Sequence, residues 1–190
     1  MGGTVTIYGW QPGIGDPTLW GWLTVLNYAL ACWMTVRAAR SDWRNCSFWA
    51  FTAIAMLALG VNKQLDLQSL FTAIFRQNAI DYGWYGHRRA LQKTFIEATV
   101  IIPALVVVIL AFHFRKSDRT VIGAICGLGL LGAFVAARAA SFHHMDQLLD
   151  LRFLALRMNH ILENAGIAVI AASAMRALRR RTGRARTKRG

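Results

Sequence analysis

The stretch "TVIGAICGLGLLGAFVAARAA", residues 120–140, decides the fold class of this chain. It contains a single charged residue, Arg138, and a run of about 20 apolar residues is what a helix needs to cross the hydrocarbon core of a bilayer. Its glycines predict close packing against neighbouring helices, and they are Gly123, Gly127, Gly129 and Gly132. The stretch therefore predicts a transmembrane helix over about 120 to 145.

Four further apolar runs complete the expected bundle, over about 18 to 36, 47 to 66, 94 to 114 and 155 to 178. The last run is the weakest, because Asn159, His160, Glu163 and Asn164 interrupt its first half. An alternative with four transmembrane helices places it on the membrane surface. We expect an all-α integral membrane bundle of about five transmembrane helices, forming a single domain over 1–178.

Composition agrees with this class. Hydrophobic residues make up 55% of the 190 residues and charged residues only 16%, so we expect no separate soluble domain. The three cysteines are scattered, which argues against a disulfide framework or a zinc finger. Much of the net charge of +13 lies in a basic tail, 179–190, which we expect to be disordered. A basic tail after an apolar helix indicates topology and contact with anionic lipid, so we expect no nucleic-acid partner.

The segment from about 67 to 93 links the second and third helices. Its first half has apolar residues at helical spacing, and its second half is rich in aromatic residues and glycine. This pattern predicts an amphipathic helix at the membrane interface, followed by a turn. We expect its basic residues to bind lipid headgroups, namely Arg76, Arg88, Arg89 and Lys93.

Orientation follows from the distribution of Lys and Arg. Five crossings place 14 of the 22 basic residues on the same side as the C-terminal tail and eight on the other. Because basic residues concentrate on the cytoplasmic side, we expect an outside N-terminus and a cytoplasmic C-terminus.

Strongly polar residues gather at the outer ends of the expected helices. They occur in "NKQLDLQ" (62–68), "YGHRR" (85–89), "RAASFHHMD" (138–146) and "RMNHILEN" (157–164). Ionisable groups at membrane depth are costly, and they usually pair or line a functional cavity. The candidate catalytic residues are Asp66, His143, His144 and Asp146. Asn62, Lys63 and Arg138 are expected to support them.

Two spacings in this outer layer are compatible with a metal site. His143 and Asp146 are three residues apart, as are His160 and Glu163, so each pair falls on one helical face. Neutral imidazole and carboxylate suit zinc, iron or manganese. We therefore expect these four residues to be the ligands of a divalent metal, if one is bound.

Purely structural alternatives exist for the same residues. A hairpin that turns near residue 150 places Arg138 opposite Glu163, where the two could form a buried ion pair that fixes helix register. Lys63 could extend to the headgroups from a helix end. Asn27 is expected to hydrogen-bond between helices, and Pro103 to kink its helix.

Three segments together resemble a group of uncharacterised small bacterial multi-pass inner-membrane proteins. They are "NKQLDLQ" at 62–68, "GWYGHRRALQ" at 83–92 and "RAASFHHMD" at 138–146. The resemblance covers roughly the middle two-thirds of the chain. It implies a bacterial inner-membrane protein with an outward-facing set of polar motifs, and it implies no activity.

The resulting hypothesis is a polar pocket at the outer leaflet that acts on a lipid or a lipid-linked substrate. One alternative is a non-enzymatic accessory or assembly subunit, with other membrane proteins as partners. A second alternative is a b-type haem protein, which needs two histidines at matched depth on different helices, such as His143 or His144 with His160.

Overall fold

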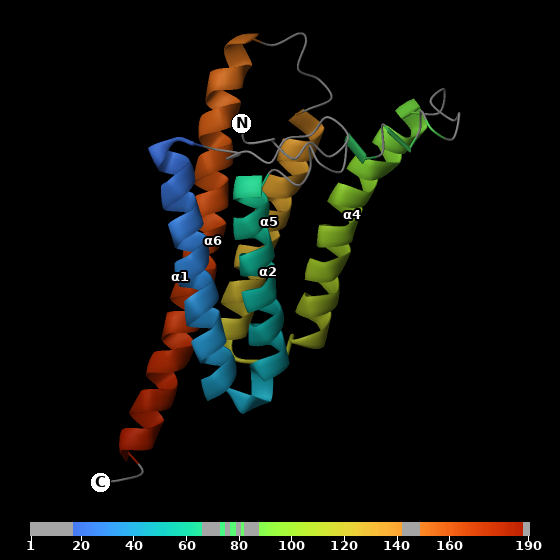
Figure 1. The fold of residues 1–190 in the computed structure, drawn as a ribbon. Helices are drawn as coiled ribbons and strands as arrows, with labels where there is room; N and C mark the ends of the chain where they lie inside the picture. The colour runs from blue at the N-terminus through green and yellow to red at the C-terminus, as the bar shows by residue number, and fades with distance from the viewer. Residues whose placement is uncertain are drawn as a thin grey trace.

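Five long helices build the described part of the chain in the computed structural model (Figure 1). They are α1 (Leu19–Ser41), α2 (Cys46–Leu65), α4 (Arg88–His113), α5 (Arg119–Ser141) and α6 (Leu149–Thr187). The structure describes residues 17–65, 73–74, 77–78, 81, 88–141 and 149–187, with the backbone alone at 88–93, 95–96, 138–141, 149–160 and 181–187. These residues contain no strand, which confirms the all-α class.

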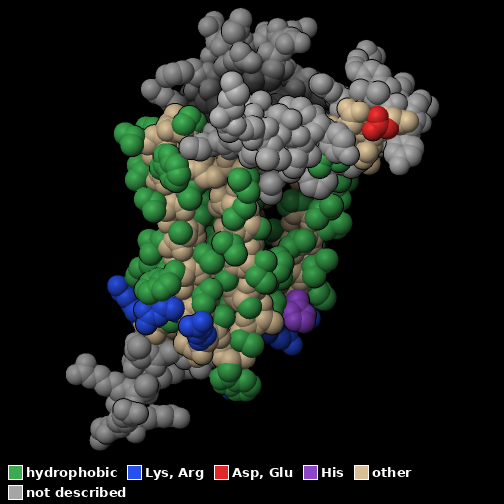
Figure 2. Space-filling view, viewed as in Figure 1, with side chains coloured by type: hydrophobic (Ala, Val, Ile, Leu, Met, Phe, Trp, Pro, Cys, Tyr) green, Lys and Arg blue, Asp and Glu red, His purple; other side chains and the backbone are tan. Residues whose placement is uncertain are grey.

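Four helical stretches are long and apolar enough to cross a membrane: Leu19–Ser41, Trp43–Leu65, Arg119–Ala137 and Ile161–Arg180. Helix α4 contains a shorter apolar stretch, Glu97–His113. The stretch in α6 confirms the apolar helix that the sequence indicated most weakly. Large apolar side chains face outward along the bundle, as Figure 2 shows, with Leu26 and Ile109 each 63% exposed. Such an outer surface is suited to lipid.

Successive helices run in opposite directions, so their ends collect in two layers (Figure 1). We call the layer with Leu19, Leu65, Arg88 and Ser141 the upper end, and the layer with Ser41, Cys46, His113 and Arg119 the lower end. Helix α1 packs against α2 and α6, and α5 packs against α6 and α4. The start of α6 projects beyond its neighbours at the upper end.

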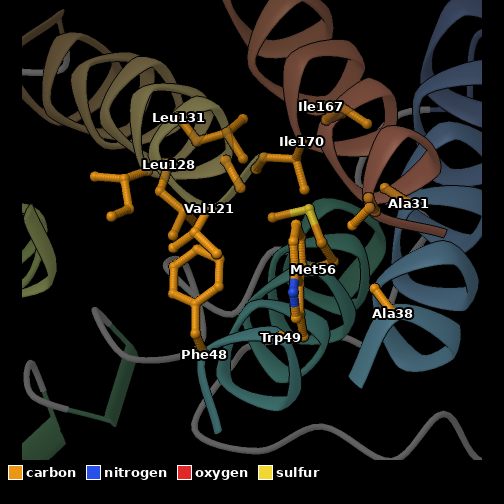
Figure 3. Close-up of a cluster of buried hydrophobic side chains, with 14 of the residues drawn as sticks. Ala31, Ala38, Phe48, Trp49, Met56, Val121, Leu128, Leu131, Ile167 and Ile170 are labelled. Carbon is orange, nitrogen blue, oxygen red and sulfur yellow. The ribbon is translucent and has the colours of Figure 1, made fainter. Parts of the chain in front are cut away.

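The core is built from stripes that repeat every seven residues. In α1 the buried residues are Gly21, Thr24, Tyr28, Ala31, Thr35 and Ala38, an alternation of three and four. This is the spacing of helices that pack side by side with a slight left-handed twist. Figure 3 shows how Phe48, Trp49 and Met56 of α2 meet Val121 of α5 and Ile170 of α6 in the centre of the bundle.

Glycines on two faces of α5 let it approach two helices, as predicted. A Cβ added to Gly127 would lie 3.0 Å from the carbonyl oxygen of Gly166 in α6. On another face, a Cβ added to Gly132 would lie 3.3 Å from Cβ of Pro103 in α4. Small residues bring membrane helices close enough for their backbones to touch, so the predicted close packing is confirmed for Gly123, Gly127 and Gly132.

The register of the α5–α6 hairpin differs from the expected one. Gly127 lies against Ile170, and Leu131 lies against Gly166, so facing residues have numbers that add to 297 instead of 301. The placement of Arg138 opposite Glu163 is therefore wrong by about one helical turn. The contacts of Gly127 and Gly166 set this register. The expected register came from an assumed turn near residue 150 and did not take these contacts into account.

Helix α6 extends into the segment that we expected to be a disordered tail, since it continues to Thr187. Arginine and alanine are good helix formers, and extending an existing helix requires no new nucleation. The amphipathic helix expected within 67–93 falls mostly outside the described residues. Those described within 67–81 are helical, and Gln77 Nε2 donates to Asp81 Oδ1 at 2.9 Å.

A polar junction joins two turns at the lower end. Asn45, in the 3₁₀ turn Trp43–Asn45, donates from Nδ2 to Oδ2 of Asp42 at 2.9 Å. Its own Oδ1 accepts a hydrogen bond from the hydroxyl of Ser117, in the α4–α5 turn, at 3.2 Å. Asp42 and Asn45 are both buried. One amide side chain therefore ties the α1–α2 connection to the α4–α5 connection.

Candidate functional site

An ion pair lies inside the upper half of the bundle. Nζ of Lys63 donates to Oε2 of Glu163 at 2.9 Å, joining α2 to α6. The hydroxyl of Tyr28 in α1 donates to the other carboxylate oxygen, Oε1, at 3.2 Å. Lys63 is 8% exposed, Tyr28 2% and Glu163 1%. We call these three residues the polar centre.

Helical periodicity explains why all three side chains point inward. Lys63 follows Trp49 and Met56 at intervals of seven, so it occupies the core stripe of α2. Glu163 precedes Ile170 and Ala177 at the same interval in α6. Tyr28 lies between Gly21 and Thr35 in α1. Toward the upper end, the stripes that build the apolar core therefore carry charged and polar groups.

The carboxylate of Glu163 is well satisfied where it lies. One oxygen accepts from an ammonium and the other from a phenol, so each has a hydrogen-bond donor. A buried charge without a partner is strongly unfavourable, and a pair offsets this cost only when its geometry is good and further hydrogen bonds are made. Both conditions hold here, because the short contact to Lys63 is accompanied by the bond from Tyr28.

A second polar chain lies beside the centre, on the same helices α1 and α6. Nδ2 of Asn27 donates to Oδ1 of Asn164 at 3.0 Å, which confirms the interhelical hydrogen bond expected of Asn27. Nδ2 of Asn164 donates to the hydroxyl oxygen of Thr24 at 3.3 Å. Thr24 in turn donates to the backbone carbonyl of Trp20 at 2.9 Å. These bonds fix α1 against α6 at the level of Glu163.

Gln64 adds an unusual feature next to Lys63. Both polar atoms of its side-chain amide are buried, and they find no hydrogen-bond partner among the described residues. Asn62, on the other side of Lys63, is exposed. Buried polar groups are nearly always hydrogen-bonded in proteins. The start of "NKQLDLQ" thus presents one satisfied charge and one amide without a described partner.

The structure brings together only part of the predicted site. Lys63 and Glu163 meet directly, although we had predicted Lys63 as a supporting residue and Glu163 as a metal ligand. Asp66, Arg76, His143, His144 and Asp146 lie outside the described residues. For Arg88, Arg89, Lys93, Arg138 and His160 only the backbone is described, within α4, α5 and α6. The predicted catalytic and headgroup-binding roles therefore stay predictions.

One structural alternative is wrong, namely the extension of Lys63 to the lipid headgroups. Its side chain turns into the bundle and pairs with Glu163, since the stripe of Trp49 and Met56 faces inward. Tyr28 was not among the predicted residues. Its seven-residue spacing from Gly21 and Thr35 was the signal that could have placed its hydroxyl in the core.

Metal binding is not visible in the described part of the chain, where no three His, Cys, Asp or Glu side chains come close enough to share an ion. Three of the four predicted ligands have no described side chain. In this arrangement the fourth, Glu163, uses both oxygens within the polar centre. Coordination by Glu163 would have to use the remaining lone pairs of these two oxygens, next to Lys63 and Tyr28.

Comparison of the chain with protein-family models, with curated proteins and with solved structures found no match.

Proposed function

We propose that this chain is a multi-pass protein of the bacterial inner membrane, with its C-terminus in the cytoplasm. The distribution of basic residues supports this orientation. Figure 2 shows Lys and Arg side chains at the lower end of the apolar surface. The turns at that end contribute Arg44, Arg115, Lys116 and Arg119, and α6 leaves the bundle there with Arg176, Arg179 and Arg180. Basic residues favour the cytoplasmic side, so the polar centre lies toward the outer leaflet.

The proposed function is the binding or conversion of an anionic lipid, or a lipid-linked substrate, at the polar centre. A single observation carries this proposal: Lys63 and Glu163 hold opposite charges 2.9 Å apart within an apolar bundle. Ionisable residues at membrane depth are rare, and they mark substrate paths and proton relays. Lys63 and Glu163 are such residues, and each is the other's partner.

The geometry suggests how a substrate would use the centre. An anionic group that approaches Lys63 competes with Glu163 for the same ammonium. Exchange of partners would leave the carboxylate free to accept a proton from the substrate, as a general base does. Tyr28 would stay hydrogen-bonded to Oε1 and hold the carboxylate in position. Lys63 is thus the anion-binding group, Glu163 the base and Tyr28 the positioning residue.

The outer polar residues are proposed to surround the entry to this centre. Asp66, His143, His144, Asp146 and His160 belong to this group, with Arg76, Arg88, Arg89 and Lys93 as contacts for headgroups. A divalent metal, zinc, iron or manganese, belongs to the proposal only through the histidines and Asp146. Such an ion would polarise a bound phosphate or ester.

A double substitution tests the proposal. In a host whose own copy of the gene is deleted, we expect one class of lipid or lipid-linked intermediate to change in amount. The wild-type chain should restore it, and K63M/E163Q should not, although this variant reaches the membrane. Lys116→Gln, which removes an exposed charge from the lower end, serves as the control. Full restoration by K63M/E163Q contradicts the proposal.

The alternative is a non-enzymatic accessory or assembly subunit. It is favoured by the mutual satisfaction of Lys63, Glu163 and Tyr28, because the centre is complete without a ligand. Under this alternative the lipid profile is unchanged by the deletion. A larger complex should instead disappear from native gels of the membrane fraction, and K63M/E163Q should restore it.

A further inference from the structure

A groove of about 420 Å³ runs along the outside of the bundle between α1 and α6. Leu30 and Met34 form its wall on α1, and Ile167 and Met175 form its wall on α6. Ala168, Ala171 and Ala172 line it between these larger side chains. Their methyl groups are too small to fill the space beside the helix contact. The groove is therefore an apolar channel that opens to the membrane.

The two ends of the groove differ in chemistry. Toward the upper end, the hydrogen bond between Asn27 and Asn164 closes it. Toward the lower end, Arg176 and Arg179 line it. Both arginines are exposed, and they lie near the level where the basic turns mark the membrane surface. An apolar channel with cationic groups at its surface end matches the shape and charge of an anionic phospholipid.

The length of the groove agrees with this ligand. Along α6, Asn164 and Arg176 are separated by about 18 Å, at a rise of 1.5 Å per residue. One leaflet contributes about 15 Å of hydrocarbon, half of a core of about 30 Å. A chain that starts at Arg176 therefore ends about 3 Å short of the level of the Asn27–Asn164 bond.

We propose that this groove binds one acyl chain of an anionic phospholipid from the cytoplasmic leaflet, with the lipid phosphate held by Arg176 and Arg179. Guanidinium groups bind phosphate oxygens through paired N–H donors, which gives them an advantage over lysine at such a position. The adjoining basic segment, with Arg180 and the tail, adds attraction for an anionic leaflet. The arginines of this site lie at the opposite end of the bundle from the polar centre. The assignment to the cytoplasmic leaflet rests on the proposed orientation, whereas lipid binding in the groove is independent of any ligand at the polar centre.

Lipid titration of the purified full chain in mild detergent tests the proposal. The probes are dioleoyl phosphatidylglycerol, phosphatidylethanolamine and phosphatidylcholine, and bound lipids are counted by native mass spectrometry. Each basic side chain near an anionic surface contributes about a five-fold gain in affinity. We therefore expect R176Q/R179Q to weaken phosphatidylglycerol binding by about 10- to 30-fold.

Two further variants separate the groove from general basic character. A168L/A172L fills the channel and leaves every charge in place, so it should also weaken phosphatidylglycerol binding. K116Q/R119Q removes the same charge as R176Q/R179Q from the same end of the bundle, away from the groove, and should bind like the wild type. Glycerol phosphate has the headgroup chemistry without the chains and should not compete.

Three results would overturn the proposal. Equal weakening by R176Q/R179Q and K116Q/R119Q would show a diffuse basic surface. Undiminished binding by A168L/A172L would show that no acyl chain enters the groove. A change in oligomeric mass on filling the groove, without a change in lipid binding, would assign it to a second copy of the chain. The substituted side chains are exposed, and an unchanged melting temperature without added lipid verifies that the variants fold.

Discussion

Lys63 and Glu163 are 100 positions apart in the chain, and their side chains meet at 2.9 Å inside an apolar bundle. Neither helix could bury its charge alone, because a single charge in hydrocarbon has no compensating partner. The contact therefore exists only when α2 and α6 have packed in the correct order around α1. It is a specific joint between the second helix, α2, and the last helix, α6, and it is also the proposed ligand-binding centre.

Removal of one member of the pair should destabilise the protein more than removal of both. We expect Lys63→Met or Glu163→Gln alone to cost about 3 to 5 kcal/mol, because the remaining buried group loses its partner. K63M/E163Q should recover a large part of this loss. Unfolding in a denaturing detergent, followed by circular dichroism, measures the three values. A double variant that is as unstable as the sum of the singles would show that the two side chains do not interact.

The contact between Gly127 and Gly166 should tolerate no added methyl group. An alanine Cβ at Gly127 would lie 2.6 Å from Cγ1 of Ile170 and 3.0 Å from the Gly166 carbonyl oxygen. We expect Gly127→Ala to destabilise the bundle by about 1 to 3 kcal/mol, as overpacking does.

Gly129→Ala is the matched control for this prediction. Its Cβ would lie 3.8 Å from the nearest atom, Cγ1 of Val107, which is an ordinary contact. Alanine also has the better helix propensity, so this variant should be neutral or slightly more stable. Thermal melting of both variants in the same detergent gives the comparison, and equal melting temperatures would contradict the packing account.

Asn45→Ala should loosen the lower end of the bundle. The substitution removes a donor from the buried carboxylate of Asp42 and an acceptor from the hydroxyl of Ser117. Loss of a partner for a buried polar group costs about 1 to 3 kcal/mol. Asn62→Ala, at an exposed position, should change stability by less than about 0.5 kcal/mol. Hydrogen–deuterium exchange measures the effect. Amides in the α1–α2 turn should exchange faster in Asn45→Ala and should be unchanged in Asn62→Ala.

The proposed orientation predicts which turns react with an impermeant thiol reagent. In a background without Cys32, Cys46 and Cys126, all of them free thiols, single cysteines are introduced at Asp81 and at Lys116. Asp81→Cys should be labelled in intact spheroplasts, and Lys116→Cys only after the membrane is permeabilised. The reverse pattern would invert the topology and place the polar centre in the cytoplasmic leaflet.

Metal content distinguishes two descriptions of the site. In one, the residues predicted from the sequence bind a metal ion, and in the other Lys63 and Glu163 form the centre without a metal. Detergent-purified protein is analysed for zinc, iron and manganese together with His143→Ala and Glu163→Gln. If His143, Asp146 and His160 bind an ion, His143→Ala should lose it and Glu163→Gln should keep most of it, because Glu163 is engaged by Lys63 and Tyr28. Loss in both variants would restore Glu163 to the ligand set. An ion retained by both variants would rule out His143 as a ligand.

The apolar runs by themselves determined the class of this protein. Helix α2 begins and ends within one residue of its predicted bounds, and α1, α4 and α5 each have one end that close to the prediction. The start of α4 and the ends of α1 and α5 differ from the prediction by about four to six residues. Long apolar helices are defined by local sequence, because in hydrocarbon each backbone group must be satisfied within its own segment. The glycine series and the hydrogen bond of Asn27 were also predictable from local sequence. Small and polar residues inside a membrane helix mostly serve contacts between helices.

Only the tertiary structure decided which polar groups meet. Lys63, Tyr28 and Glu163 come from three helices, and their contact depends on the rotation and register of each helix. The seven-residue spacing of each residue from its neighbours in the stripe could have placed it in the core, but it could not show which stripes face one another. The α5–α6 register, set by Gly127 and Gly166, moved Arg138 about one turn from its expected level. Helix formation is local, whereas the pairing of charges depends on packing between segments up to 100 residues or more apart.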